Sequence, residues 1–182
     1  MSDHPDEKDL IRRCLRGRED AQRALYEREL PSTYNLVLRL TGNRADSEDL
    51  VQECFLRVFT ELHTFRGEAG LGTWIKRIAV NLTLNHLKRL RRLQIVPVEE
   101  RHLPPEPVRL STAGIDPRTL HTAIAALPQG CRIVLTLHLL EGYPHAEVAD
   151  YLGISVSTSK SQLWRAKQLL RTALQDKRYA NG

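Results

Sequence analysis

The segment that decides the fold reads Asp46-Ser47-Glu48-Asp49-Leu50-Val51-Gln52-Glu53-Cys54-Phe55-Leu56-Arg57-Val58-Phe59. Its apolar residues come in adjacent pairs that repeat every four positions, which is the spacing of one buried face of an α-helix. We therefore expect an amphipathic helix over residues 44–63. Its buried face carries Leu50, Val51, Cys54, Phe55, Val58 and Phe59, and its opposite face carries Asp46, Asp49, Gln52 and Glu53.

The acidic face of this helix needs an explanation of its own, because the apolar face suffices for folding. Acids in the first turn complement the helix dipole, which accounts for Asp46, Glu48 and Asp49. Glu53 lies two turns further on, and Arg57 is the only base between Asp46 and Phe59. On spacing alone, a solvated face and a docking surface remain open.

Charge is unevenly distributed along the chain of 182 residues, whose net charge is +5 and whose pI is near 9.3. No acid occurs between Glu68 and Glu99, where six bases lie, or between Asp150 and Asp176, where four lie. Two basic helices, one in each half, favour a polyanion contacted at two places. The alternative is two solvated basic faces.

Cysteine usage and hydropathy indicate the compartment. Cys14, Cys54 and Cys131 are odd in number, far apart and without CxxC spacing, which favours a reducing compartment and argues against a disulfide frame or a zinc site. Cys54 lies on the apolar face and is expected in the core. The N-terminus has no apolar leader and no segment approaches the length of a membrane span. We expect a cytoplasmic protein without membrane insertion.

The pattern along the chain predicts an all-α fold with two small helical domains, at residues 7–93 and 118–176. A loop with three glycines occupies residues 64–72, and Thr73 is expected to cap the helix that follows. Pro31 is expected to kink or break the helix around it. Residues 94–117 contain five prolines and are expected to form a flexible linker. The other helices are expected at 7–16, 19–41, 73–93, 118–126, 129–141, 144–152 and 155–176.

The last helix of the first domain carries a basic stripe. At about 100° per residue, Ile75, Ile78, Ala79 and Leu82 share one side. Arginine and lysine suit phosphates, asparagine can bond base edges, and an aromatic can stack on an unpaired base. Nucleic-acid contact is the better interpretation, although Trp74 could be core and the asparagines solvated. The stripe contains Arg77, Asn81, Asn85, Lys88 and Arg92, with Trp74 at its edge.

Residues 144–155 predict a helix-turn-helix. Ala149 allows two helices to approach closely, Gly153 suits a positive φ, and Ser155 can cap the next helix. In that helix Val156, Leu163, Leu170 and Leu174 are expected inward. The outward arc, which suits a major groove, contains Ser157, Lys160, Ser161, Trp164, Gln168 and Arg171. The alternative is a helical hairpin with a solvated basic helix.

Two residues of this helix fit its apolar side poorly. Ser159 points toward that side, where a branched aliphatic would pack better, and Gln162 lies at its margin. Either the helix seats more loosely or another group fills the gap, and the sequence leaves both open.

In this order, the motifs resemble those of the extracytoplasmic-function (ECF) group of sigma factors, small two-domain bacterial promoter-recognition subunits. The resemblance covers about residues 10–174. Residues 46–55 resemble region 2.2, which grips the clamp helices of the largest polymerase subunit. Residues 65–81 resemble the loop and helix that capture the melted minus-ten element. Residues 127–128, 142–143 and 149–165 resemble the minus-thirty-five reader.

The resemblance implies three sets of site residues. Those for core polymerase are Asp46, Asp49, Leu50, Gln52, Glu53 and Phe55. Those for minus-ten DNA are Phe65, Arg66, Trp74, Lys76, Arg77, Asn81, Asn85 and Lys88. Those for minus-thirty-five DNA are Ser155, Ser157, Thr158, Lys160, Ser161, Trp164, Arg165, Gln168 and Arg171.

The resemblance also implies partners and a mechanism. The partners are core RNA polymerase, through its clamp helices and the flap of its second-largest subunit, promoter DNA and an anti-sigma factor. The protein would initiate transcription without catalysis, cofactor or metal. Three positions depart from the family, which usually has an aliphatic at Ser159, often Arg at Gln162, and in many members Asp at Asn85.

Two rival functions make different predictions. A repressor or activator whose helix-turn-helix acts as a dimer would bind a palindrome without polymerase, and it leaves the acidic helix unexplained. A helical enzyme would need a chemical motif, but the sequence contains no P-loop, GxSxG, HExxH or paired metal-ligand spacing.

Overall fold

The computed structural model describes residues 5–90, 95 and 115–180, and these residues form helices without any strand. Their contacts divide the chain into two compact units, Met1–Leu87 and Lys88–Gly182. The predicted all-α class is confirmed. Among the described residues, no helix combines the length and the apolar content that crossing a membrane requires.

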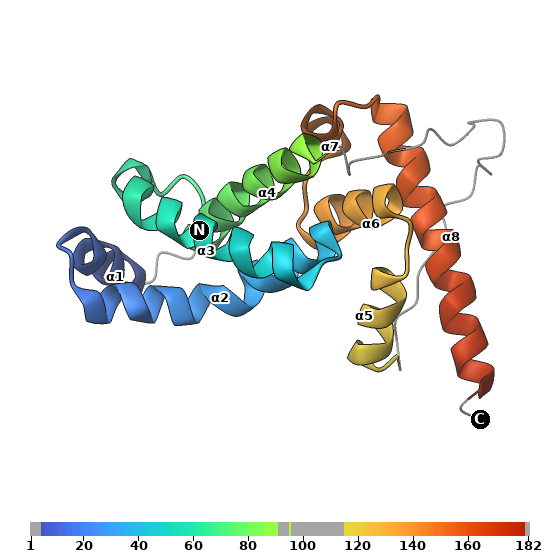
Figure 1. The fold of residues 1–182 in the computed structure, drawn as a ribbon, viewed down its shortest axis with the longest axis horizontal. Coiled ribbons are helices and arrows are strands. Elements are labelled where there is room, and N and C mark those ends of the chain that lie inside the picture. Colours follow the sequence, from blue (N-terminus) through green and yellow to red (C-terminus); the bar gives the residue numbers. More distant parts are fainter. Residues whose placement is uncertain (1–4, 91–94, 96–114, 181–182) are drawn as a thin grey trace. The chain divides into compact units, whose positions relative to one another are not determined.

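In the described part of the first unit the chain forms four α-helices and one short 3₁₀ helix (Figure 1). α2 packs along α3, and α1 packs on α2. The core between them includes Leu25, Val51, Cys54, Val58 and Ile75, all at most 2% exposed. The elements are α1 (Pro5–Leu15), α2 (Glu19–Thr41), α3 (Arg44–Glu61), η1 (Leu62–Thr64) and α4 (Leu71–Arg89).

The turn between α2 and α3 fixes where the amphipathic helix begins. α2 ends at Gly42, whose φ of 68° is the left-handed conformation that glycine adopts without strain. Asn43 caps α3, because its Oδ1 accepts from the Asp46 N–H at 3.0 Å. The buried hydroxyls of Thr41 and Ser47 lie 2.8 Å apart across the turn. These bonds set the rotation of α3 and therefore which residues it exposes.

Pro31 does not break α2, which continues through it to Thr41. Of the two outcomes expected at this proline, the break is therefore excluded. The predicted start of α4 is wrong. α4 begins at Leu71, before the expected cap Thr73. The Leu71 N–H donates to Glu7 Oε1 of α1 at 3.4 Å, so a carboxylate from another helix replaces the local cap.

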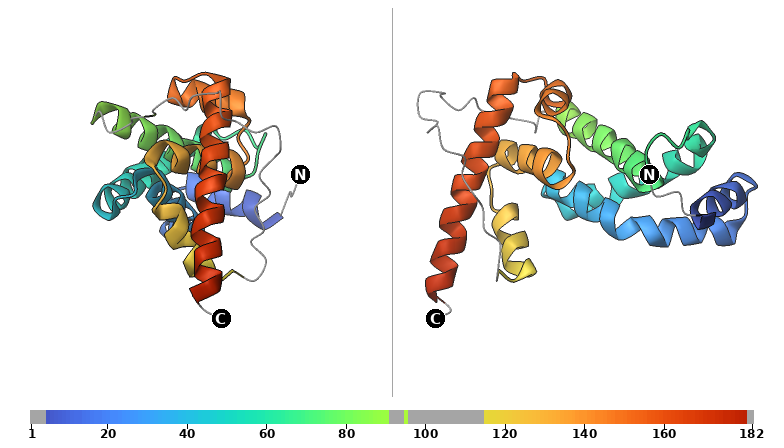
Figure 2. Two further views of the ribbon diagram at one scale, coloured as in Figure 1. Left: turned by 90° about the vertical axis from the view of Figure 1, so that its right-hand side faces the viewer. Right: turned by 180° about the vertical axis from the view of Figure 1, so that it is seen from behind.

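The second unit contains the predicted helix-turn-helix (Figure 2). α8 packs against α5, α6 and α7. The core includes Cys131, Ile133, Leu137, Val148 and Ala166, all at most 1% exposed. The elements are α5 (Pro117–Ala125), α6 (Gln129–Leu135), the π-helical η3 (Thr136–Leu140), α7 (His145–Leu152) and α8 (Val156–Ala180).

Capping residues explain the starts and turns of these helices. Asp116 caps α5 by accepting from the Thr119 N–H at 3.1 Å, and Pro117 occupies the first turn. Gly153 ends α7 with a φ of 66°, as the helix-turn-helix interpretation requires. Of the predicted linker, residues 94 and 96–114 lie outside the described residues, as does Arg92 of the basic stripe.

Candidate functional site

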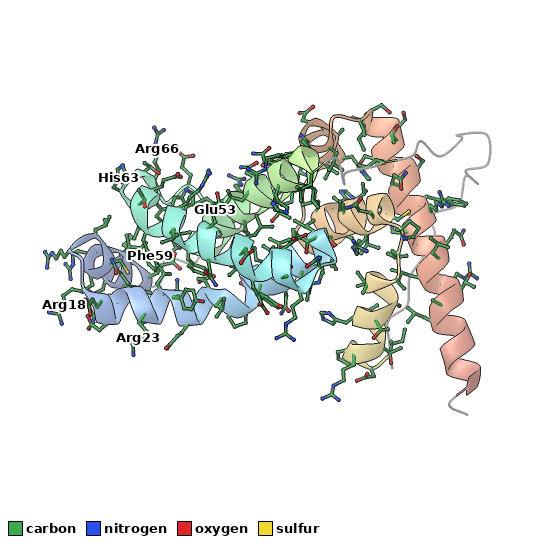
Figure 3. All side chains as sticks on the ribbon, viewed as in Figure 1. Arg18, Arg23, Glu53, Phe59, His63 and Arg66 are labelled. Carbon is green, nitrogen blue, oxygen red and sulfur yellow. The ribbon has the colours of Figure 1, made fainter. Side chains whose placement is uncertain are left out.

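α3 presents one continuous polar surface around an exposed leucine. Asp49, Gln52, Glu53 and Leu56 are exposed and share one side of the helix at about 100° per residue; we call these four residues the α3 face. Leu56 is 70% exposed. Glu53 (Figure 3) also pairs with Arg57 at 3.2 Å, so the acidic charge at this end of the face is partly balanced.

Leu56 is a residue that the periodicity argument missed. It falls outside the paired apolar positions, so it was not assigned to the core or to the docking set. It lies four residues after Gln52 and seven after Asp49, the spacing that places side chains on one side of a helix. An exposed leucine ringed by polar groups is a common centre for a protein contact. The spacing was readable in the sequence.

The structure corrects two of the expected docking residues. Leu50 and Phe55 are 4% and 3% exposed and belong to the core of the first unit, because they lie about 110° around the helix from the middle of the α3 face. They therefore support the surface without being part of it. Asp46 is half-buried: its side chain is 22% exposed, and its Oδ2 lies 3.8 Å from His86 Nε2 on α4.

The core beneath α3 is apolar and tightly packed. The Phe55 ring meets the Tyr26 ring of α2 edge-on, with centroids 4.7 Å apart. Cys54 is fully buried, which confirms the prediction of a core thiol, and burial raises its pKa from 9.0 to about 12. This thiol stays protonated, so its role is packing and not reactivity.

α4 carries the predicted polar stripe. Arg77, Asn81, Asn85 and Lys88 are all exposed, and their spacing places them on one side of the helix. Lys76 does not join them, since it lies about 100° away from Arg77 around the helix and is half-buried. The stripe contains no acid, so it presents cationic and amide groups together.

Trp74 and Phe65 form an aromatic pair at the start of this stripe. Their ring centroids lie 5.6 Å apart with the planes at 59°. Both side chains are partly buried against the core of the first unit. The pair is therefore held in place from below while retaining surface that another ring could contact.

A basic cavity, shallow and largely open to solvent, lies next to Phe65. It has a volume of about 450 Å³ and is bounded by α1 and by residues 65–67. Its cationic lining comes from Lys8, Arg12, Arg16 and Arg66 (Arg66 is labelled in Figure 3). Its apolar lining comes from Ile11, Leu15 and Phe65. Sequence reasoning named Phe65 and Arg66 but not α1, because only the folded chain brings this helix to the loop.

The helix-turn-helix of the second unit has the expected local geometry. Ser155 caps α8 by accepting from the Thr158 N–H at 3.0 Å, and Ala149 is buried at 3% exposure. Of the residues expected at minus-thirty-five DNA, the exposed ones are Ser155, Ser157, Lys160, Arg165 and Arg171, and the half-buried ones are Thr158, Trp164 and Gln168.

Two residues of α8 differ from expectation. Ser161 is fully buried, and its hydroxyl donates to the carbonyl of Thr158 at 2.9 Å. It is therefore not presented to a ligand, because its hydrogen bond is used within the helix. Val156 was expected inward but is 41% exposed, because it is the first residue of α8, at the end of the packed segment.

The two poorly fitting residues of α8 have polar partners. Ser159 is fully buried, and its Oγ lies 2.8 Å from Nδ1 of His145 on α7. Gln162 is 3% exposed, and its Oε1 accepts from Cys131 Sγ of α6 at 3.1 Å. The second alternative is therefore correct: other groups fill the gap, and they do so with hydrogen bonds.

Among the described residues, no three His, Cys, Asp or Glu side chains gather where they could hold a metal ion. What the two units do present is one acidic face with an apolar centre and two surfaces rich in cations. This combination is typical of a protein that binds another protein and a nucleic acid.

Two family models match the chain. Sigma-70 region 2 matches residues 25–93, and Sigma-70 region 4 matches residues 118–170. The chain belongs to the sigma-70 family of RNA polymerase sigma factors, within its extracytoplasmic-function group.

Named relatives agree with this assignment over nearly the whole chain. The RNA polymerase sigma-H factor of Pseudomonas aeruginosa is 29% identical over 96% of this chain and 97% of that protein. The ECF RNA polymerase sigma-E factor of Escherichia coli K12 is 27% identical over 96% and 97%. The ECF RNA polymerase sigma factor SigE of Mycolicibacterium smegmatis is 32% identical over 82% of this chain and 60% of that protein.

Solved structures share the fold. A Bartonella quintana sigma factor RpoE, crystallised with the anti-sigma factor NepR, superposes with a TM-score of 0.53 at 22% identity, over 84% of this chain and 96% of that one. CnrH, solved with the cytosolic domain of CnrY, gives 0.53 at 20% identity, over 93% and 97%. At these identities the likeness concerns the fold alone.

Proposed function

We propose that this sigma factor acts as a non-catalytic subunit in the cytoplasm, where it recruits core RNA polymerase through the α3 face and uses α4 and α8 on promoter DNA. The observation that carries the proposal is the separation of charge. The α3 face is acidic with an apolar centre, whereas α4 and α8 present cations and amides. A protein that only bound DNA would have no use for an acidic exposed face, because phosphates would repel it.

For the polymerase, the proposed contacts are the α3 face and a second apolar spot. Asp49 and Glu53 can pair with bases on the clamp helices of the largest subunit while Leu56 is buried at the centre of the contact. In the second unit, Leu139 and Leu140 are 47% and 43% exposed at the end of η3. We assign them to the flap of the second-largest subunit.

For the minus-ten element, the proposed contacts are the exposed stripe of α4 and the basic cavity next to Phe65. Arg77 and Lys88 neutralise phosphates, and Asn81 and Asn85 face base edges. The basic cavity of α1 and residues 65–67 has the charge and apolar walls that an extruded nucleotide requires. Extrusion costs a few kcal/mol of unstacking energy, and these contacts with the separated strand offset it.

For the minus-thirty-five element, the proposed reader is the N-terminal part of α8. Its exposed hydroxyls, Lys160 and Arg165 lie where a recognition helix meets base edges and phosphates. The cap at Ser155 keeps the first turn of the helix intact. The linker would let two modest DNA contacts act together through effective concentration.

Regulation by an anti-sigma factor belongs to the same proposal. Two neighbours in fold were solved with partners, one with the anti-sigma factor NepR and one with the cytosolic domain of CnrY. We propose that an anti-sigma factor holds this chain inactive by covering the α3 face, which core polymerase also needs. Competition between the two partners for the purified chain would show this directly.

Charge reversal on the α3 face tests the docking assignment. The Glu53→Lys variant should fail to co-elute with core polymerase in gel filtration, with its helical circular dichroism unchanged. Glu61→Lys, also exposed on α3 but two turns beyond Glu53, is the matched control and should co-elute. Co-elution of Glu53→Lys at the wild-type level would exclude the α3 face as the docking surface.

A further inference from the structure

The contact between α7 and α8 contains a polar pair where an apolar one would suffice. Ser159 is fully buried within α8, and its hydroxyl lies 2.8 Å from His145 Nδ1 at the start of α7. A buried hydroxyl that loses its partner costs free energy, so this bond constrains how α8 can seat on α7. Ser159 lies on the same helix as Lys160 and Arg165, so a change in its seating moves the DNA-facing arc.

A second histidine fixes the ring of the first. The rings of His138 and His145 stack with centroids 3.8 Å apart and planes at 17°. His138 Nδ1 lies 2.8 Å from the carbonyl oxygen of Tyr143. Because a carbonyl only accepts, His138 must carry its proton on Nδ1 in this bond. The His145 ring is therefore clamped between the stacked His138 ring and the hydroxyl of Ser159.

The groups that face His145 disfavour a positive charge on it. They are the stacked ring of His138 on η3 and the ammonium groups of Lys160 and Lys167 on α8. Burial, then the His138 ring and the two ammonium groups, lower the pKa of His145 below its ordinary 6.5. At neutral pH the ring is uncharged, which is the form compatible with close stacking.

We propose that His145 is a positioning residue for promoter recognition: through Ser159 its neutral ring sets the seating of α8 on α7, and acidification loosens that seating. This inference rests on the proposed function of α8 as the DNA reader. A protonated His145 can still donate to Ser159, so the hydrogen bond alone is not what acid removes. When His145 is protonated, its positive charge is disfavoured by His138, Lys160 and Lys167, and this repulsion separates the stacked rings of His145 and His138.

The direction of the pH effect follows from linkage. A histidine whose pKa is lower in the folded protein binds fewer protons there than in the unfolded chain. The stabilisation is complete above pH 6.5 and is lost as the pH falls through 6.5 toward the lowered pKa of His145. A side chain that does not titrate at this position would give no such dependence.

Three variants separate positioning from simple packing. Ser159→Ala removes the hydroxyl and leaves the histidine. His145→Asn keeps an amide that can bond the hydroxyl but cannot titrate. His145→Leu with Ser159→Val replaces the polar pair by an apolar one. His121→Asn, at an exposed position of α5, controls for the loss of a histidine.

The measurement is DNA affinity of the full chain in reconstituted holoenzyme, at pH 7.5 and 5.5. The probe is the duplex that wild-type holoenzyme selects from a pool with a random upstream region. At pH 7.5, Ser159→Ala should bind about 3- to 10-fold more weakly, as expected for one buried hydrogen bond. His145→Asn and the apolar double variant should bind within about 3-fold of wild type. Between pH 7.5 and 5.5, the loss of DNA affinity should be several-fold smaller for His145→Asn and for the apolar double variant than for wild type and His121→Asn.

Two results would overturn the inference. One is wild-type affinity of Ser159→Ala at pH 7.5, and the other is the same acid response in His145→Asn as in wild type. If the holoenzyme selects no duplex at all, the proposed function fails instead. The inference is then decided by nuclear magnetic resonance of the full chain, in which the His145 ring and the α8 amides should titrate together below pH 6.5. Independent titration would refute it.

Discussion

Leu56 offers the sharpest test of how this sigma factor binds core polymerase. It is 70% exposed in the free protein, so folding buries only a small part of its side chain. Full burial of a leucine contributes about 1.5–3 kcal/mol. Leu56→Ala should therefore change the free energy of unfolding by less than about 1 kcal/mol. If a partner covers the exposed part, the variant loses about 1–2 kcal/mol of binding, or roughly 5- to 30-fold in Kd.

The assay is a titration of fluorescently labelled protein with core polymerase, followed by anisotropy, alongside thermal unfolding. Leu169→Ala serves as the control, because Leu169 is also an exposed leucine, 39% exposed, but lies on α8. It should leave the Kd unchanged. Equal Kd values for Leu56→Ala and wild type would refute the argument that the α3 face is the docking surface. A matching loss of Tm would show that the leucine supports folding instead.

Three further predictions concern the surfaces and the core. Ser155→Ala removes the cap of α8 and should lower the free energy of unfolding by about 1 kcal/mol. The measurement is urea unfolding of the second unit followed by Trp164 fluorescence, whose midpoint should fall. An unchanged midpoint would contradict the cap. Arg66→Ala should weaken binding of single-stranded minus-ten DNA by holoenzyme and reduce its salt dependence, whereas Arg23→Ala, exposed on α2, should not. Cys54, with its pKa raised from 9.0 to about 12, should resist alkylation in the native protein. Because the unfolded thiol ionises at lower pH than the folded one, the free energy of unfolding should fall as the pH rises above 9. Rapid alkylation of Cys54 in the native protein would contradict its burial.

The sequence predicted those features that depend on local periodicity. The core face of α3 and the stripe on α4 both follow from residues three and four apart, and Gly153 and Ser155 follow from turn and cap chemistry. Boundaries were harder, because α4 starts with help from Glu7, a residue 64 positions earlier. No local pattern could supply that carboxylate.

Features that depend on tertiary contacts were not predictable from one sequence. In the sequence Ser159 is a polar residue on an apolar face without an evident partner. Its partner is His145, 14 positions away, which only the folded chain brings beside it. The basic cavity needed α1 to meet residues 65–67. Family resemblance assigns Leu50 and Phe55 to docking, whereas the apolar periodicity of the helix places them in the core. The periodicity predicts the burial of these two residues correctly.

The central claim is that this chain gives core RNA polymerase a specific start site that the core alone lacks. The most direct measurement maps the 5′ ends of RNA made by purified core polymerase on the selected duplex, extended downstream, with and without the protein. We expect one discrete start with the wild-type chain and none with Glu53→Lys. Identical RNA ends with and without the wild-type chain would contradict the account.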